Sequence, residues 1–210
     1  RLTRDLSILD LPPGDIRNCL VALADEEPLM TKLLQYRFDG ASSDLGGHSL
    51  GNLLIAALTD ITGDFERAVQ ETSRVLAIRG RVMRPTLQHV QLCAAMHDGR
   101  QVRGETNITG AEGTVDYVYM DPPAPPAVPA ALQAIHDARV VIIGPGSTYT
   151  SVIPNLLVSG VEEALTETSA VRIFVCNVMT QPGETDGFTA SDHVRTIEKH
   201  VDAPIFDYVL

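Results

Sequence analysis

The chain has 210 residues, of which 44% are hydrophobic and 20% are charged, and its formal net charge is −11. This composition is typical of a globular protein and argues against disorder and against nucleic acid as the main partner, because phosphate backbones are bound by clustered lysines and arginines. No apolar run reaches the length needed to cross a bilayer, and the three cysteines lack metal or redox spacing, so we expect a cytoplasmic protein without membrane insertion.

The first part of the chain is predicted to be helical. Apolar residues recur at helical spacing in four segments, residues 15–24, 27–37, 48–61 and 64–78. The third segment is nearly all apolar, so we expect it to lie in the interior. The fourth carries its apolar residues on one face, which comprises Phe65, Ala68, Val69, Val75 and Leu76.

The middle of the chain changes to a strand pattern. Residues 90–97 and 100–107 flank Asp98-Gly99, a dipeptide that favours a tight hairpin turn because both residues tolerate a positive φ. Residues 115–120 alternate like a third strand. We therefore expect a small β-hairpin insertion over residues 90–120, followed by a stiff proline-rich connector, DPPAPPAVP, over residues 121–129.

Helices and strands alternate in the last third of the chain. Helices are predicted at residues 129–138, 160–168 and 191–200, and apolar strands at residues 140–144, 171–178 and 207–210. Continuous apolar strands separated by helices are typical of a parallel sheet that is covered on both faces. The predicted fold class is α/β, with a Rossmann-like, mostly parallel sheet and helices on both of its faces.

A polar loop follows the first of these strands, at the end where α/β sheets bind ligands. After Ile143 the chain reads GPGSTYTSVIPN, in which Gly144 and Gly146 could present main-chain N–H groups to an anion. Hydroxyls for the same anion are offered by Ser147, Thr148, Thr150 and Ser151. The alternative is that the glycines only turn the chain and the hydroxyls cap the next helix, and this stretch alone leaves both open.

A second polar loop, MTQPGETDGF, follows Val178 and is rich in turn-forming residues. Gln181, Glu184 and Thr185 could bind hydroxyls or the edge of a base. Glu184 or Asp186 could instead cap the following helix. If the two strands are neighbours, both loops face a common crevice at the carboxyl ends of the strands.

The segment PPGDIRN in the helical first part raises the same choice between structure and binding. Asp15 follows Pro-Pro-Gly and can cap the helix that begins there. Arg17 and Asn18 project from the first turn of that helix, where anions are favoured.

His48 precedes an apolar helix in GGHSLGNL, where it is either a structural cap or a ligand contact. Ser49 and Asn52 are polar positions on this helix, so they are either satisfied internally or face a ligand. No serine and aspartate stand near His48 in the pattern of a catalytic triad, and the histidines and cysteines lack metal-site spacing. No cofactor is therefore assigned, although Mg²⁺ could be held through the phosphates of a ligand.

Four long segments occur in a characteristic order and spacing, PPGDIRNCLVALA, GGHSLGNLLIAALTDITGDFERA, VVIIGPGSTYTSVIPNLL and FVCNVMTQPGETDGF. Together they resemble the gluconeogenesis factor (YvcK-like) family, a bacterial branch of the 2-phospho-L-lactate transferase (CofD-like) superfamily. The resemblance covers nearly the whole chain. It implies a Rossmann-like core with a ligand crevice at the strand ends.

The resemblance also implies a function. Members of this family bind UDP-sugars, notably UDP-N-acetylglucosamine, and influence cell-wall synthesis, cell shape and growth on gluconeogenic carbon. Distant transferase relatives bind a guanosine diphosphate-type nucleotide with Mg²⁺ and transfer a phospholactyl group. We expect a regulatory nucleotide-sugar-binding protein rather than a transferase, because no general base stands in a clear catalytic motif. Expected partners are a UDP-sugar or another nucleotide diphosphate, cell-wall synthesis proteins, and a second copy in a homodimer.

The chain departs from the family pattern in three places. It lacks the usual N-terminal βαβ segment with its GGGTG loop and DDGGSSG-like stretch, so we expect residues 1–210 to be one partial domain. Thr148 stands where the family usually has leucine, and Pro85 falls one place later than expected, which affects any role for Thr86. The residues predicted to bind the ligand are Asp15, Arg17, Asn18, His48, Ser49, Asn52, Gly144, Gly146, Ser147, Thr150, Ser151, Asn155, Asn177, Gln181, Glu184 and Thr185.

Overall fold

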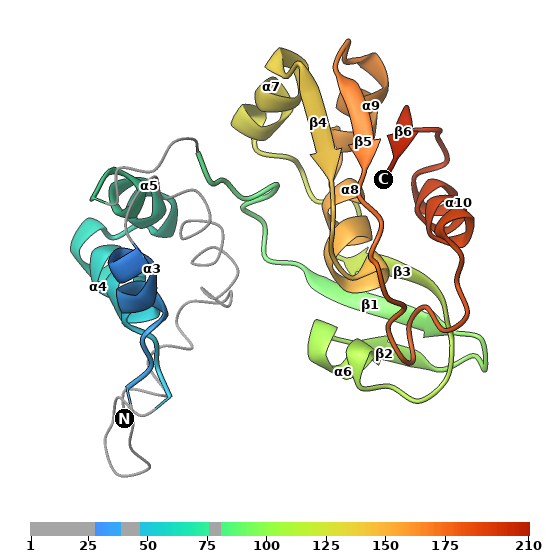
Figure 1. The fold of residues 1–210 in the computed structure, drawn as a ribbon, viewed down its shortest axis with the longest axis horizontal. Helices are drawn as coiled ribbons and strands as arrows, with labels where there is room; N and C mark the ends of the chain where they lie inside the picture. The colour runs from blue at the N-terminus through green and yellow to red at the C-terminus, as the bar shows by residue number, and fades with distance from the viewer. Residues whose placement is uncertain (1–27, 39–46, 76–80) are drawn as a thin grey trace. The chain divides into compact units, whose positions relative to one another are not determined.

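The computed structural model describes residues 28–38, 47–75 and 81–210 (Figure 1). The chain divides into two units, residues 1–83 and residues 84–210, and each is described by itself. The helix predicted at residues 15–24 lies outside the described residues. The single domain predicted over residues 1–210 stays a prediction.

The first unit contains three described helices, α3 (Pro28–Gln35), α4 (Leu50–Thr62) and α5 (Phe65–Val75). Helix α4 begins where Ser49 accepts a hydrogen bond from the main-chain N–H of Asn52 (3.2 Å). It ends at Gly63, whose left-handed conformation lets its N–H donate to the carbonyl of Thr59. Local capping signals therefore set both ends of α4.

The predicted burial of these helices is wrong in part. Within α4 only Gly51 and Ile55 are buried, and Ile61 is 78% exposed, so α4 is not an interior helix among the described residues. In α5 the predicted apolar face is narrower than expected, because Ala68 and Val69 are buried whereas Val75 is exposed. Leu76 lies outside the described residues. An apolar side chain contributes to a core only where another element covers it, and the helical pattern alone does not show this.

The second unit begins with an antiparallel sheet of β1 (Gln91–Met96), β2 (Gln101–Arg103) and β3 (Val115–Asp121), in the order β2-β1-β3. The predicted hairpin is confirmed, with Gly99 at φ 87° and the N–H of Arg100 donating to Asp98 Oδ1 (3.0 Å). The strand predicted to run to residue 107 is wrong beyond Arg103. Gly104 adopts φ 89° and turns the chain into the short helix α6 (Glu105–Thr109).

A parallel sheet follows, formed by β4 (Val140–Ile143), β5 (Val171–Phe174) and β6 (Tyr208–Val209) in that order. Strands β4 and β5 pair from Val140–Val171 to Ile143–Phe174. Helix α7 (Pro129–Asp137) precedes β4, and two further helices, α9 (Val161–Glu167) and α10 (Ala190–Val201), connect the strands. The predicted α/β fold with a parallel sheet is thereby confirmed.

Strand β4 is buried on one side rather than on both. Ile143 and Phe174 lie in the core, whereas Val140 is 49% and Ile142 is 64% exposed. The prediction of continuously buried strands is therefore wrong for the described residues, since burial alternates along β4 with the period of a strand. Strand β5 also ends earlier than predicted, at Phe174, and Val178 is fully exposed.

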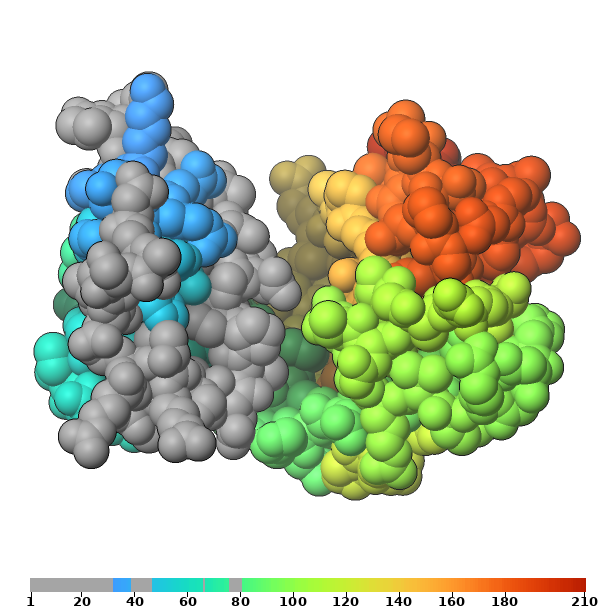
Figure 2. All heavy atoms as spheres, turned by 90° about the horizontal axis from the view of Figure 1, so that it is seen from below, coloured from blue at the N-terminus to red at the C-terminus, as the bar shows by residue number. Residues whose placement is uncertain are grey.

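The carboxyl ends of the parallel strands face the antiparallel sheet. In Figure 1 the arrow of β4 points toward β1 and β3, and in Figure 2 the antiparallel region (green) lies directly against the later segments of this unit (orange to red). The contact is partly polar, because the main-chain N–H of Val118 in β3 donates to Nε2 of His200 in α10 (3.1 Å). Ile153, Ile197 and Ile205 are completely buried in the same core. The loops that follow β4 and β5 are consequently held by packed elements.

Candidate functional site

The loop after β4 begins with a glycine that the packing requires. Gly144 has φ +82°, and a Cβ added to it would lie 2.8 Å from the carbonyl oxygen of Val175. That carbonyl belongs to the main chain that continues β5, and the N–H of the same residue donates to the carbonyl of Ile143 (2.9 Å). A side chain at residue 144 would push the two strand ends apart. Turning the chain at this point is therefore one role of Gly144.

A wide helical turn follows this loop. Ser147 caps the π-helix η2 (Thr148–Val152), and its carbonyl accepts from the N–H of Val152 (2.8 Å). Ser147 Oγ accepts from both the N–H (3.2 Å) and the hydroxyl (2.7 Å) of Thr150. The turn passes directly into α8 (Ile153–Leu156). The capping role proposed for these hydroxyls is thus confirmed for Ser147, and π turns are frequent at functional sites.

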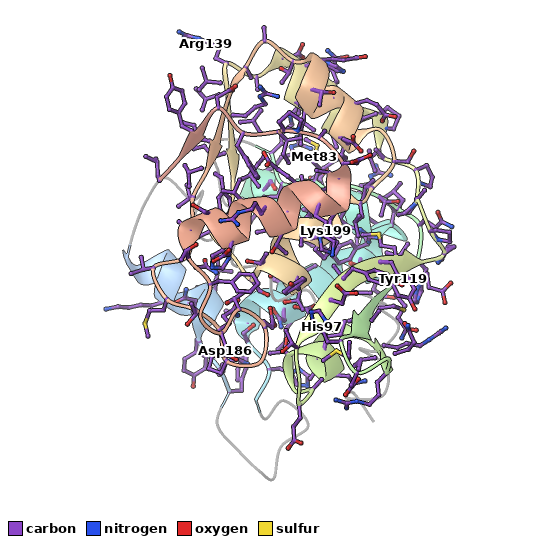
Figure 3. The ribbon with its side chains drawn as sticks, turned by 90° about the vertical axis from the view of Figure 1, so that its right-hand side faces the viewer. Met83, His97, Tyr119, Arg139, Asp186 and Lys199 are labelled. Atoms are coloured by element: carbon purple, nitrogen blue, oxygen red, sulfur yellow. The ribbon has the colours of Figure 1, made fainter. Side chains whose placement is uncertain are left out.

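The second loop is closed by its own hydrogen bonds. The N–H of Gln181 donates to Thr185 Oγ1 (2.8 Å), and the N–H of Gly183 donates to Asp186 Oδ2 (2.7 Å). Figure 3 labels Asp186 on this loop, before helix α10. Helix α10 is capped by Thr189 and not by Glu184 or Asp186, so that predicted capping role is wrong. Thr189 stands at the position where its hydroxyl accepts from the N–H of Asp192.

Two side chains join the second loop region to the first. The amide of Asn177 accepts from the N–H of Gly146 (3.1 Å) and donates to the carbonyl of the same residue (2.8 Å). The carboxylate of Glu184 accepts hydrogen bonds from the hydroxyl of Ser147 and, through its other oxygen, from the hydroxyl of Thr109 (3.1 Å). The two strand-end loops are therefore one hydrogen-bonded structure, as expected for neighbouring parallel strands.

A pocket of about 320 Å³ opens beside the first loop. Its apolar wall comes from the end of β4 and from α8, and two polar residues, Ser151 and Asn155, also line it. Both polar residues are exposed, and Asn155 Nδ2 donates to the carbonyl of Ser151 (2.6 Å). The residues lining the pocket are Ile142, Ile143, Gly144, Pro145, Ser151, Val152, Asn155 and Leu156. An apolar hollow with a few polar groups is typical of a small-molecule site.

The structure places the predicted site residues in three groups. The residues of the two strand-end loops lie together in the second unit, namely Gly144, Gly146, Ser147, Thr150, Ser151, Asn155, Asn177, Gln181, Glu184 and Thr185. His48, Ser49 and Asn52 belong to the first unit, where Ser49 caps α4 and Asn52 Oδ1 is buried without a partner among the described residues. Asp15, Arg17 and Asn18 lie outside the described residues. A common site for all three groups stays a prediction.

Two residues of the loop structure were not predicted from the sequence. Thr109 reaches Glu184 from α6, and His193 in α10 lies 2.7 Å from Thr148 through its Nδ1 atom. Burial lowers the pKa of His193, which is consistent with a neutral ring against the Thr148 hydroxyl. An isolated threonine or histidine on a helix carries no sequence signal for such a contact.

Metal-ligand clusters and membrane-spanning helices are absent from the part of the chain that the structure describes. No three His, Cys, Asp or Glu residues gather there in a group that could hold a metal ion. None of the described helices is long and apolar enough to cross a membrane.

Comparison with known proteins relates this geometry to a family. The family described as 2-phospho-L-lactate transferase CofD matches residues 1–210. The chain belongs to the CofD family. Among its relatives, the gluconeogenesis factor of Halalkalibacterium halodurans is 48% identical over 210 residues, and that of Bacillus subtilis is 47% identical over 210 residues. A relative from Nostoc sp. is 54% identical over 211 residues.

Two solved structures share the fold of this chain. A crystal structure of a member of the UPF0052 family from Bacillus halodurans matches with a TM-score of 0.89 and 48% identity, covering 96% of this chain and 64% of that chain. A second crystal structure from the same organism matches with a TM-score of 0.91 and 47% identity, over 99% of this chain and 67% of that one. These sequence matches include the whole of the present chain. They span only 46% of the length of the Nostoc relative, 64% of the Halalkalibacterium relative and 65% of the Bacillus subtilis relative.

Proposed function

We propose that this protein binds a nucleotide sugar of the UDP-N-acetylglucosamine type and acts as a regulator of growth on gluconeogenic carbon, of cell-wall synthesis and of cell shape. The gluconeogenesis factor names of its relatives support the metabolic part of this proposal. The site lies on the loops after β4 and β5. Cell-wall synthesis proteins and a second copy of the chain are the proposed protein partners, and the proposed location is the cytoplasm.

The observation that carries the proposal is the pairing of two polar loops at the carboxyl ends of neighbouring parallel strands. Ligands of open α/β sheets bind beyond these strand ends. The pocket beside Gly144 adds an apolar wall for a flat ring or a methyl group, and its polar residues Ser151 and Asn155 can form hydrogen bonds with a ligand.

Binding without turnover is supported by the state of the ionisable side chains near the loops. The carboxylate of Glu184 is buried and hydrogen-bonded to two hydroxyls, and the Nδ1 atom of His193 contacts Thr148. Neither Glu184 nor His193 is among the residues that line the pocket. A general base must come within hydrogen-bond reach of the proton that it removes.

The second candidate function is Mg²⁺-dependent transfer of a phospholactyl-type group from a nucleotide diphosphate donor, and the family description favours it. Such transfer can rely on positioning and electrostatics alone. Mg²⁺ would then be held mainly through the phosphates of the ligand. Incubating the complete protein with nucleotide-linked phospholactate, Mg²⁺ and an acceptor decides between the two functions, because product formation would establish turnover.

Calorimetric titration of the complete protein with UDP-N-acetylglucosamine tests the proposed function. At a ligand concentration of about 100 times Kd, binding should add roughly 2.7 kcal/mol to the free energy of unfolding. Asn155→Ala should weaken binding. Asn107→Ala is the matched control, since Asn107 also donates to the carbonyl four residues earlier, Arg103 (2.8 Å), but lies on α6 outside the pocket. Absence of binding to the wild-type protein would refute the proposal.

A further inference from the structure

The hydroxyl of Ser147 has no hydrogen-bonding capacity left for a ligand. A serine hydroxyl donates one hydrogen bond and accepts two. Here it donates to Glu184 Oε2 and accepts from the N–H (3.2 Å) and the hydroxyl (2.7 Å) of Thr150. A ligand phosphate can reach this hydroxyl only by displacing Glu184.

Glu184 is held in place as firmly as the serine. Its residue is 2% exposed, one carboxylate oxygen binds Ser147, and the other binds Thr109. Its main-chain N–H donates to the carbonyl of Gln181 (3.1 Å). None of the ion pairs formed between described residues includes Glu184. A buried carboxylate without a cation depends on its hydrogen bonds, so moving Glu184 toward a ligand would leave two hydroxyls unpaired.

We propose that Glu184 is a positioning residue for nucleotide-sugar binding and does not contact the ligand. This inference rests on the proposed function. Through Ser147, Glu184 holds the first turn of η2, and through Thr109 it ties that turn to α6 and the antiparallel sheet. In this proposal Glu184 and Ser147 hold the loop in place, whereas the sequence predicted that both residues contact the ligand. Ligand contacts are left to residues such as Ser151 and Asn155, which line the pocket.

Positioning and direct contact predict different responses to substitution. Glu184→Ala should lower the affinity for UDP-N-acetylglucosamine by about tenfold, because the hydroxyls of Ser147 and Thr109 lose their acceptor. Glu184→Gln should retain affinity within about threefold. The amide oxygen of the glutamine can accept from the hydroxyl of Ser147, and its amide N–H can donate to the hydroxyl of Thr109, which can rotate. Thr109→Val should give an intermediate loss because it removes one of the two hydroxyls that hold the carboxylate.

The test uses the complete protein and measures affinity by calorimetry for UDP-N-acetylglucosamine, UDP-glucose and UDP. A positioning residue predicts the same loss in Glu184→Ala for all three ligands, and circular dichroism checks that each variant is folded. Glu167→Ala, an exposed glutamate of α9, is the control and should bind like the wild type. If Glu184→Ala does not fold, Thr109→Val and Glu184→Gln still carry the test.

Several outcomes would overturn the inference. Loss of affinity confined to the sugar-containing ligands would show that Glu184 contacts the sugar. Wild-type affinity in both Glu184→Ala and Thr109→Val, or an equally large loss in Glu184→Gln and Glu184→Ala, would show that the hydrogen-bond chain does not position the loop. In these cases the proposed function survives. If the wild-type protein binds none of the three nucleotides, the proposed function and the inference both fail.

Discussion

Replacing Asn177 by alanine should destabilise the second unit by loosening the joint between its two strand-end loops. The amide of Asn177 pairs with both the N–H (3.1 Å) and the carbonyl (2.8 Å) of Gly146, much as a neighbouring strand would. A neutral hydrogen bond contributes about 0.5–1.5 kcal/mol to the free energy of unfolding, so the two bonds together contribute roughly 1–3 kcal/mol. Both residues are half-buried and water can replace part of the loss, which places the expected value at about 1–2 kcal/mol.

Thermal unfolding followed by far-UV circular dichroism measures this effect, since the chain contains no tryptophan as a fluorescent probe. The midpoint Tm should fall by roughly 2–8 °C in Asn177→Ala. At neutral pH the Tm of Asn177→Asp should be no higher than that of Asn177→Ala, because the aspartate carboxylate keeps the bond to the N–H of Gly146 but faces the carbonyl oxygen of the same residue. Near pH 4 the aspartate gains a proton and can donate to that carbonyl. The Tm of Asn177→Asp should then rise relative to that of Asn177→Ala. An unchanged Tm in Asn177→Ala, or wild-type stability in Asn177→Asp at pH 7, would refute this reasoning.

Local signals account for the parts of the fold that could be predicted. The hairpin depends on Asp98-Gly99, and the order of helices and strands in the second unit depends on the period of apolar residues. The errors concern features that a short window does not contain. In the sequence Gly104 gives no sign that the strand stops, but in the structure its positive φ ends β2. The exposure of Ile142 depends on which other segment covers the sheet, and that is set by contacts far along the chain.

The location of the candidate site could be predicted from the sequence, but the hydrogen bonds between its residues could not. Parallel strands place their carboxyl ends at one edge of the sheet, so loops after β4 and β5 had to meet if the strands were neighbours. The individual bonds join residues that are distant in sequence. Asn177 lies 31 residues from Gly146, and Glu184 lies 37 residues from Ser147 and 75 from Thr109. The residue types were compatible with ligand binding and with mutual pairing, and only the three-dimensional arrangement shows that they pair.

Two further substitutions test the packing around the site. Gly144→Ala should lower Tm more than Gly187→Ala. Both positions have a positive φ, but only at residue 144 would the new Cβ lie 2.8 Å from the carbonyl oxygen of Val175. Equal decreases of Tm in the two variants would contradict this close approach. His200→Gln should reduce the acid sensitivity of the fold. Burial is the main cause that lowers the pKa of His200 below its ordinary value of 6.5, and its Nε2 must stay unprotonated to accept from the N–H of Val118. Because the folded pKa is depressed, the unfolded chain binds the proton first, so the contribution of His200 is complete above pH 6.5 and is lost as the pH falls toward the folded pKa. Urea unfolding measures this effect between about pH 7 and pH 5. As the pH falls, the free energy of unfolding should decline less steeply in His200→Gln than in the wild type. If the free energies of the two proteins decline equally with pH, the fold does not hold this histidine neutral.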